Sequence, residues 1–265
     1  MFARAITPAA LAGALLLPFG SAAAQQFHYA PGTSHYRMTV DAKVTQTVMG
    51  QSNDAQLNSG QQFTMTLAQK TPDTLAMTVT IDSISQTTSM GPTPGLDALM
   101  GKQVQALLSP TGAFYSKAVV GDTAAALESV ADQLVHILPT VRKPLAAGAT
   151  WTDTTTMSTV QSGLNVKRQV ISTFTVVGDT TIGRSTAWKI RRNSSSTTSG
   201  LGAIQGQNAS MDGTSTGTGV VFLSHDGNFL GGQGEENVKA KLTLTDAGVS
   251  YDIGTTATSR IERMN

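Results

Sequence analysis

Residues 213–217 match the pattern G-x-S-x-G, in which the serine of a hydrolase can act as a nucleophile. That chemistry requires the serine on a sharp turn between a strand and a helix, with an acid and a histidine further along the chain. Ser215 instead lies in a Gly- and Thr-rich tract that leads into another apolar strand, and the only histidine after it is His225. We therefore interpret the match as a chance one and expect no enzyme activity.

The sequence supports metal or cofactor chemistry no better than it supports a serine hydrolase. The four histidines lack the spacing of metal ligands on a helix face. Aspartates in Gly-rich turns lack the alternating acids and the closing glutamate of a calcium-binding loop. The chain has no cysteine, which excludes thiolate metal sites, disulfide chemistry and a cysteine-linked lipid anchor. We expect no metal site and no cofactor.

Five basic residues form a candidate anion-binding patch. If 164–177 and 184–193 form a hairpin that pairs Val170 with Ile190, these residues gather near its open end. Like charges on adjacent strands oppose each other, so a partner is expected. That partner is either Glu235 or Glu236 within the fold, or an anionic head group on a ligand. The patch comprises Lys167, Arg168, Lys189, Arg191 and Arg192.

Methionines on apolar strand faces allow two interpretations. Methionine fills irregular cores, and it also lines adaptable apolar cavities. The cavity interpretation gains from architecture, because a curled sheet of about eleven strands is wider than side chains easily fill. The candidate cavity lining comprises Met38, Met65 and Met77 from strands, and Leu134 and Leu138 from a helix above them.

The elements that would position these groups are nearly all strands. Apolar and polar residues alternate over 36–48, 63–68 and 75–82, which predicts an antiparallel meander with one apolar face. The polar segment 50–60 is predicted as a loop. Further strands are expected near 102–109, near 113–120 and from Trp151 onward, with 199–219 predicted as a loop plus a weak strand. Short turn sequences separate most of these segments.

One amphipathic helix is predicted over 122–138. Asp122 can cap its start, leucine and valine repeat with helical spacing, and Pro139 ends it. We therefore expect a mainly β protein: residues 25–265 form a single domain, a large curled antiparallel sheet or open β-barrel of about eleven strands with one helix near 122–138. Whether the sheet closes, stays open or forms a sandwich is left undecided by the pattern.

The first 24 residues predict export. A single positive charge, Arg4, precedes a short apolar run, and small residues flank a cut after Ala24. We expect a periplasmic or extracellular protein with this signal peptide removed. Loss of Arg4 would leave equal numbers of acidic and basic residues, and only 13% of the chain is charged. This composition argues against a nucleic-acid partner, and no apolar run is long enough for a transmembrane helix.

The chain resembles an uncharacterised bacterial exported family. The resemblance rests on Tyr29-Ala30-Pro31-Gly32 before a long strand, on the central helix, and on Leu138-Pro139 followed by Gly148-Ala149-Thr150-Trp151. It implies an exported β-rich fold and assigns no activity. By element count the chain is also similar to periplasmic lipoprotein carriers, whose unclosed barrel of about eleven strands holds acyl chains under a helical lid. This second comparison is an analogy of architecture.

Three functional hypotheses follow. The first is an exported soluble protein that binds a lipid or another apolar or amphiphilic small molecule in a β cavity under the helix. The second is an envelope scaffold or adhesion module whose Thr-rich sheet face contacts a protein partner. The third is an outer-membrane β-barrel, although aromatic residues make up only 5% of the chain and form no girdles.

Overall fold

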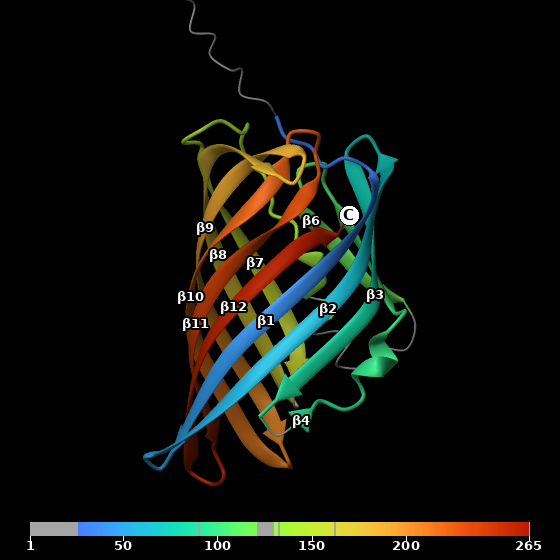
Figure 1. The fold of residues 1–265 in the computed structure, drawn as a ribbon. Helices are drawn as coiled ribbons and strands as arrows, with labels where there is room; N and C mark the ends of the chain where they lie inside the picture. The colour runs from blue at the N-terminus through green and yellow to red at the C-terminus, as the bar shows by residue number, and fades with distance from the viewer. Residues whose placement is uncertain (1–25, 90, 121–129, 132, 162, 265) are drawn as a thin grey trace, which may run out of the picture.

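The protein is one antiparallel sheet curled into an open half-barrel (Figure 1). The structure, a computed structural model, describes residues 26–89, 91–120, 130–131, 133–161 and 163–264. The strands follow the order β6-β5-β3-β2-β1-β12-β11-β10-β9-β8-β7, with the short β4 paired to β3, so β6 and β7 are the two edges. The predicted fold class and strand number are confirmed.

The sheet is built mainly of long strands joined by short turns. The first half of the chain contributes β1 Gly32–Val48, β2 Gln51–Thr71, β3 Thr74–Thr88, β4 Gly91–Pro92, the 3₁₀ helix η1 Leu96–Leu99, β5 Gln103–Leu108 and β6 Phe114–Val120. The second half contributes β7 Thr150–Gln161, β8 Leu164–Ile182, β9 Ser185–Ile204, β10 Gln207–Ser224, β11 Phe229–Leu244 and β12 Val249–Met264.

Two segments predicted as loops are strands. Residues 51–60 pair with residues 39–48 of β1, and residues 199–204 and 207–219 belong to β9 and β10. Two-residue turns suffice because Met49-Gly50 and Gln205-Gly206 all adopt positive φ, as type I′ hairpin turns require. Small polar residues in these segments leave the backbone ladder intact, and that ladder decides the local structure.

Glycines on the concave face allow neighbouring strands to approach closely. Gly219 on β10 lies opposite Gly234 on β11. A Cβ atom at Gly219 would lie 2.5 Å from the carbonyl oxygen of Gln233, and one at Gly217 would lie 2.7 Å from the hydroxyl of Ser194. Larger side chains would force these strands apart, so the Gly- and Ser-rich composition is part of how the sheet curls.

A segment between β6 and β7 fills the upper half of the interior, the end at which β1 begins in Figure 1. Leu134, Leu138 and Leu145 are fully or almost fully buried against the concave face. Two hydrogen bonds fasten the segment: the hydroxyl of Tyr29 donates to the carbonyl of Pro139 at 2.8 Å, and the indole of Trp151 donates to that of Thr140 at 2.7 Å. Most of this half of the half-barrel is therefore filled by an apolar core.

The helix ends earlier than the sequence predicts, at Val135 rather than at Leu138. Residues 130–131 and 133–135 are helical, but 136–138 form a turn and irregular chain, so the predicted end at 138 is wrong. Burial of Leu138, Pro139 and Thr140 explains the difference, because tertiary packing outweighs the apolar repeat there. Residues 122–129 lie outside the described part. No helix in the described part is both long and apolar enough to cross a membrane.

Substitution of Leu134 tests whether the segment belongs to the core. Leu134→Ala is expected to lower the free energy of unfolding by about 2–5 kcal/mol, because the side chain is only 1% exposed and would leave a cavity. The control is Gln133→Ala, at the exposed residue next to Leu134, which should change the free energy of unfolding by less than about 0.5 kcal/mol. Urea unfolding measures both. Equal small effects would contradict the packing described.

Alkaline pH tests the buried hydroxyl of Tyr29. Burial raises the pKa of Tyr29 well above its usual value. The folded chain therefore holds this proton more tightly, and the free energy of unfolding falls as the pH rises above about 10 toward the folded pKa. Tyr29→Phe has no hydroxyl to titrate at this position. Between pH 9 and pH 11, the free energy of unfolding of this variant should therefore fall by about 1 kcal/mol less than that of the wild type. Identical pH dependence in both proteins would contradict it.

Candidate functional site

A belt of polar side chains crosses the concave face below the apolar core. Strand register places it there, because Arg192 on β9 pairs with Phe174 on β8 and therefore shares its face. The same alternation turns Ser172, Ser196 and Ser215 inward, and each is only 6% exposed. The polar belt comprises Arg168 and Ser172 on β8, Arg192, Ser194 and Ser196 on β9, Ser215 on β10 and Glu236 on β11.

Arg168 and Glu236 form the first half of the polar belt as an ion pair. The Ser215 hydroxyl donates to Glu236 Oε1 at 2.6 Å, and Arg168 donates to Ser215 Oγ at 3.1 Å and to Ser196 Oγ at 3.2 Å. The two charged side chains remain 34% and 36% exposed, so solvent screens the pair and its net contribution is about 1 kcal/mol. Both charges nevertheless have close partners.

Arg192 forms the other half and has no acidic partner. Its Nε donates to the hydroxyl of Ser172 at 3.2 Å, and no carboxylate in the described part of the chain lies within 4.0 Å of its guanidinium. Burial lowers the pKa of Arg192, Glu236 opposes this effect, and the like-charged Arg168 adds to it. Water still reaches the side chain through the open interior. The belt therefore contains one uncompensated positive charge.

A cavity of about 230 Å³ adjoins Arg192 at the seam between the two edge strands. Within this seam pocket, Arg142 donates to Asp153 Oδ1 from Nε at 3.0 Å and from Nη2 at 2.5 Å, so these two charges compensate each other. The pocket is lined by Phe114 of β6, by 135–140 and Arg142, by 153–156 of β7, and by Ser172, Phe174, Arg192 and Val221. Its net positive charge suits an anion.

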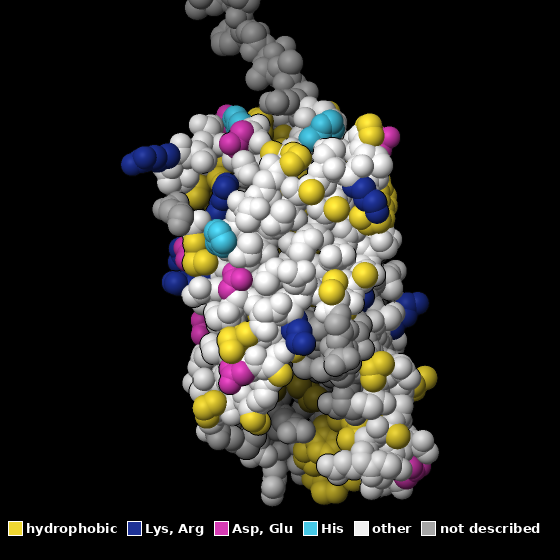
Figure 2. All heavy atoms as spheres, turned by 90° about the vertical axis from the view of Figure 1, so that its right-hand side faces the viewer, with side chains coloured by type: hydrophobic (Ala, Val, Ile, Leu, Met, Phe, Trp, Pro, Cys, Tyr) yellow, Lys and Arg dark blue, Asp and Glu magenta, His cyan; other side chains and the backbone are white. Residues whose placement is uncertain are grey.

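The interior below the polar belt is apolar and partly open. Leu164, Val166 and Ala209 form a small buried cluster on the β8–β10 side, against which Leu242 packs. Side chains that alternate inward on β1, β2, β11 and β12 are only partly buried there, unlike those of the upper core. Figure 2 shows the lower part of the molecule hollowed, with hydrophobic side chains inside the hollow. This lower mouth is lined by Ala42 and Val44, by Ala55 and Leu57, by Val238, Ala240 and Leu242, and by Tyr251 and Ile253.

The five predicted cavity residues lie in the upper half. Met65, Met77, Leu134 and Leu138 are buried in the apolar core, and Met38 packs against it partly buried. Met65 and Leu138 border a cavity of about 20 Å³, which holds at most a single water. Leu138 also lines the seam pocket. The structure thus brings the five together around the core, whereas the larger open apolar surface is the lower mouth.

The five predicted anion-patch residues do not form one patch. Ile190 pairs with Val176 rather than with Val170. Arg192 therefore lies opposite Phe174, six residues or roughly 20 Å along the strand from Arg168 at about 3.3 Å per residue, and Lys189 lies further away. The predicted pairing is wrong because β8 does not end at 177: it continues through a bulge between Val176 and Gly178 to Ile182, and Gly183, with positive φ, lies in the hairpin turn. Alternation turns only Arg168 and Arg192 inward; Lys167, Lys189 and Arg191 face outward.

The remaining candidates for chemistry are dispersed. Ser215 lies within β10, away from any turn, and its partners are Ser196, Arg168 and Glu236 rather than a histidine. His225 contacts Asp179 at 2.9 Å and stacks on Trp188 near the upper end. In the described ranges, no three histidine or acidic side chains come together as metal ligands would.

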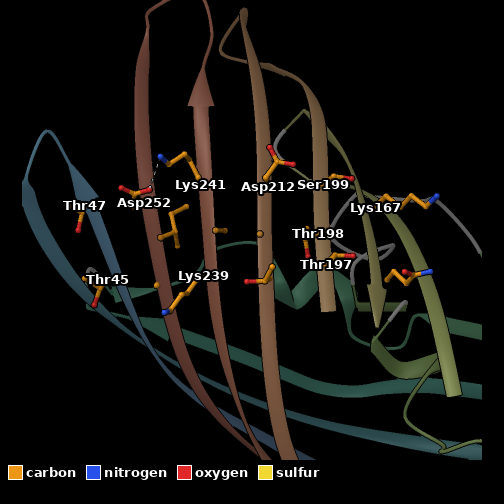
Figure 3. A pocket seen from close by; sticks show the side chains of 16 residues that line it. Thr45, Thr47, Lys167, Thr197, Thr198, Ser199, Asp212, Lys239, Lys241 and Asp252 are labelled. Atoms are coloured by element: carbon orange, nitrogen blue, oxygen red, sulfur yellow. Dashed lines mark ion pairs between the residues drawn. The ribbon is translucent and has the colours of Figure 1, made fainter. Parts of the chain in front are cut away.

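The outer face carries a shallow groove of about 990 Å³ across β1 and β8–β12 (Figure 3). Lys241 and Asp252 face each other there at 3.6 Å, and threonines and Lys239 surround them. Both charged side chains are more than half exposed, so the pair contributes little. The groove is a well-solvated surface, in contrast to the seam pocket.

Comparisons with known proteins assign no family. No family model matches the chain, and no curated protein matches it. Among solved structures, the chain is similar to the crystal structure of a DUF1329 family protein from Desulfovibrio piger, with 5% identity, a TM-score of 0.16, and coverage of 86% of this chain and 84% of that one. A likeness at this TM-score supports no statement about function.

The sequence analysis missed Arg192 as a separate interior charge and did not identify Ser172, Ser194 and Ser196 as interior residues. The signal was present in β8, because Arg168 and Ser172 alternate with the same parity as Val166, Val170 and Phe174. Charged and hydroxyl residues on an apolar strand face indicate polar groups inside the fold. Grouping the basic residues by closeness in sequence, rather than by face, concealed this.

A double-mutant cycle tests the Arg168–Glu236 pair. Arg168→Met and Glu236→Gln are expected to show a coupling of about 1 kcal/mol in the free energy of unfolding, because the two side chains share serine partners. Lys241→Met and Asp252→Asn provide the control cycle on the outer face, with an expected coupling below about 0.3 kcal/mol. Urea unfolding measures both cycles. Equal couplings would show that the interior does not strengthen the pair.

Proposed function

We propose that the protein is an exported binding protein that holds an amphiphilic small molecule in the open lower half of its half-barrel. The observation that carries the proposal is the partly exposed apolar lining of the lower mouth, directly below a polar belt. A molecule with an apolar chain removes that lining from water, and each buried CH₂ group contributes about 0.8 kcal/mol. The proposal assigns no catalytic step to the protein.

The shape of the interior favours a chain-like ligand. Buried leucines of the segment between β6 and β7 pack in the upper half, and the lower part of the molecule is hollowed (Figure 2). Serines and arginines on β8–β10 face this space together with apolar side chains on β1, β2 and β12. An interior with one polar and one apolar wall matches a molecule with a polar end and an apolar body.

Export is part of the same proposal. The signal-like first 24 residues and the nearly neutral chain suit a carrier of apolar cargo in the periplasm or outside the cell. There an apolar molecule needs a protein to cross water, because its free concentration is low. The protein would shield such a molecule without using a net charge to select its surroundings.

A neutral fluorescent probe tests the binding proposal. N-phenyl-1-naphthylamine should bind the wild-type protein with a rise and a blue shift in its fluorescence. Leu57→Glu, which places a charge in the lower mouth, should weaken binding by about tenfold or more, because an ionised carboxylate in an apolar site is costly. Gln56→Glu adds a similar charge to the outer face of the same strand and should leave the affinity unchanged within twofold.

Thermal unfolding of both variants separates binding from folding. Leu57→Glu is informative when its circular dichroism spectrum and unfolding transition match those of Gln56→Glu. Absence of probe binding to the wild type, or equal loss in both variants, would count against an interior site. Equal loss would instead favour the outer face, as the scaffold hypothesis expects.

A further inference from the structure

We propose that Arg192 binds an anionic oxygen group of the ligand, so that the molecule enters with its acidic head toward the seam pocket and its apolar chain in the lower mouth. The inference rests on the proposed function and names the chemical class of the ligand. It follows from the charges inside the half-barrel, from the free donors of Arg192 and from the pocket beside it.

Three arginines line the polar belt and the seam pocket in the described part of the chain, and Arg192 is the one that forms no ion pair. Glu236 compensates Arg168, and Asp153 compensates Arg142. Arg192 forms no ion pair with either carboxylate; burial lowers its pKa, and the more distant charge of Glu236 opposes that effect. The side chain of Arg192 is exposed to the water of the open interior, so its charge is solvated, and a bound anion would exchange that water for a direct ion pair.

The hydrogen bonds of Arg192 leave its outer nitrogens free for a ligand. Ser172 accepts from Nε at 3.2 Å, and neither Nη donates to a described residue. The single bond orients the plane of the guanidinium, and the remaining donors suit the two oxygens of a carboxylate or phosphate. Ser172 is only 6% exposed, so this orientation is set by the sheet rather than by a flexible surface group.

The seam pocket has a size suited to the head group alone. A volume of about 230 Å³ accommodates a carboxylate or a phosphate with a few waters. Phe174 and Val221 provide apolar contact beside the charge. A long alkyl chain exceeds this space and extends to the apolar wall of β1, β2 and β12, which places head and chain in different parts of one interior.

A matched pair of fluorescent probes tests this arrangement. The wild type should bind cis-parinaric acid about tenfold or more tightly than its uncharged methyl ester. Arg192→Gln should weaken binding of the acid by about tenfold or more and leave binding of the ester unchanged within twofold. Lys189→Gln removes a positive charge from the outer face of the same strand and should change neither. Fluorescence titration measures all six affinities.

Competing ligands separate the sources of the anionic group. Laurate and dodecyl phosphate should both displace parinaric acid from the wild type, and dodecanol should displace it at least tenfold less well. The stronger of the two anions identifies a carboxylate or a phosphate as the preferred head group. Equal displacement by dodecanol would overturn the role of Arg192.

The outcomes distinguish this inference from the binding proposal beneath it. Tight, equal binding of acid and ester, unaffected by Arg192→Gln, would overturn the inference while leaving the apolar site in place. No binding of either probe would overturn both. Arg192→Gln is expected to unfold at the same or a higher temperature, because it removes an uncompensated charge. If Arg192→Gln unfolds at a lower temperature, Arg192→Lys is measured instead, because it keeps the charge but lacks the paired donors of the guanidinium. Wild-type affinity for parinaric acid in Arg192→Lys would overturn the role assigned to the guanidinium.

Discussion

Contact between the concave face of the sheet and the segment 130–149 determines how much of the interior is filled. A curled sheet of this many strands encloses more space than its own side chains occupy. Leucines of the segment fill the upper part, and hydrogen bonds from Tyr29 and Trp151 hold the chain that follows the helical residues. The segment does not extend to the lower part, where apolar side chains remain in contact with water. The open interior is thus a consequence of how far this packing reaches.

The polar belt lies at the boundary between the filled and the open interior. Serines and glycines on β9 and β10 are small enough to let the strands approach closely. The hydroxyls of Ser196 and Ser215 also accept hydrogen bonds from Arg168, which points inward. Arg168 and Glu236 are compensated in this way. Arg192 is held by Ser172 at the edge of the seam pocket with part of its hydrogen-bonding capacity unused. The same strands therefore provide curvature and the polar chemistry of the interior.

The general fold could be predicted because the alternation of apolar and polar residues follows strand geometry directly. Prediction failed where composition and pairing conflict. Residues 51–60 and 199–219 contain small polar residues typical of loops, but their backbone pairs with neighbouring strands. The register of β8 and β9 could not be derived, because Gly178-Asp179 has the composition of a turn and lies at a bulge. That error merged inward and outward basic residues into one patch. The seam pocket joins residues distant in sequence, so no local pattern indicates it.

A crystal structure of the protein with laurate bound is the most direct test of the central claim. The account predicts the carboxylate within hydrogen-bonding distance of the Arg192 guanidinium, beside the seam pocket, and the alkyl chain along the apolar wall of the lower mouth. Laurate seated in the outer groove, or in the interior with its carboxylate in solvent away from Arg192, would contradict it.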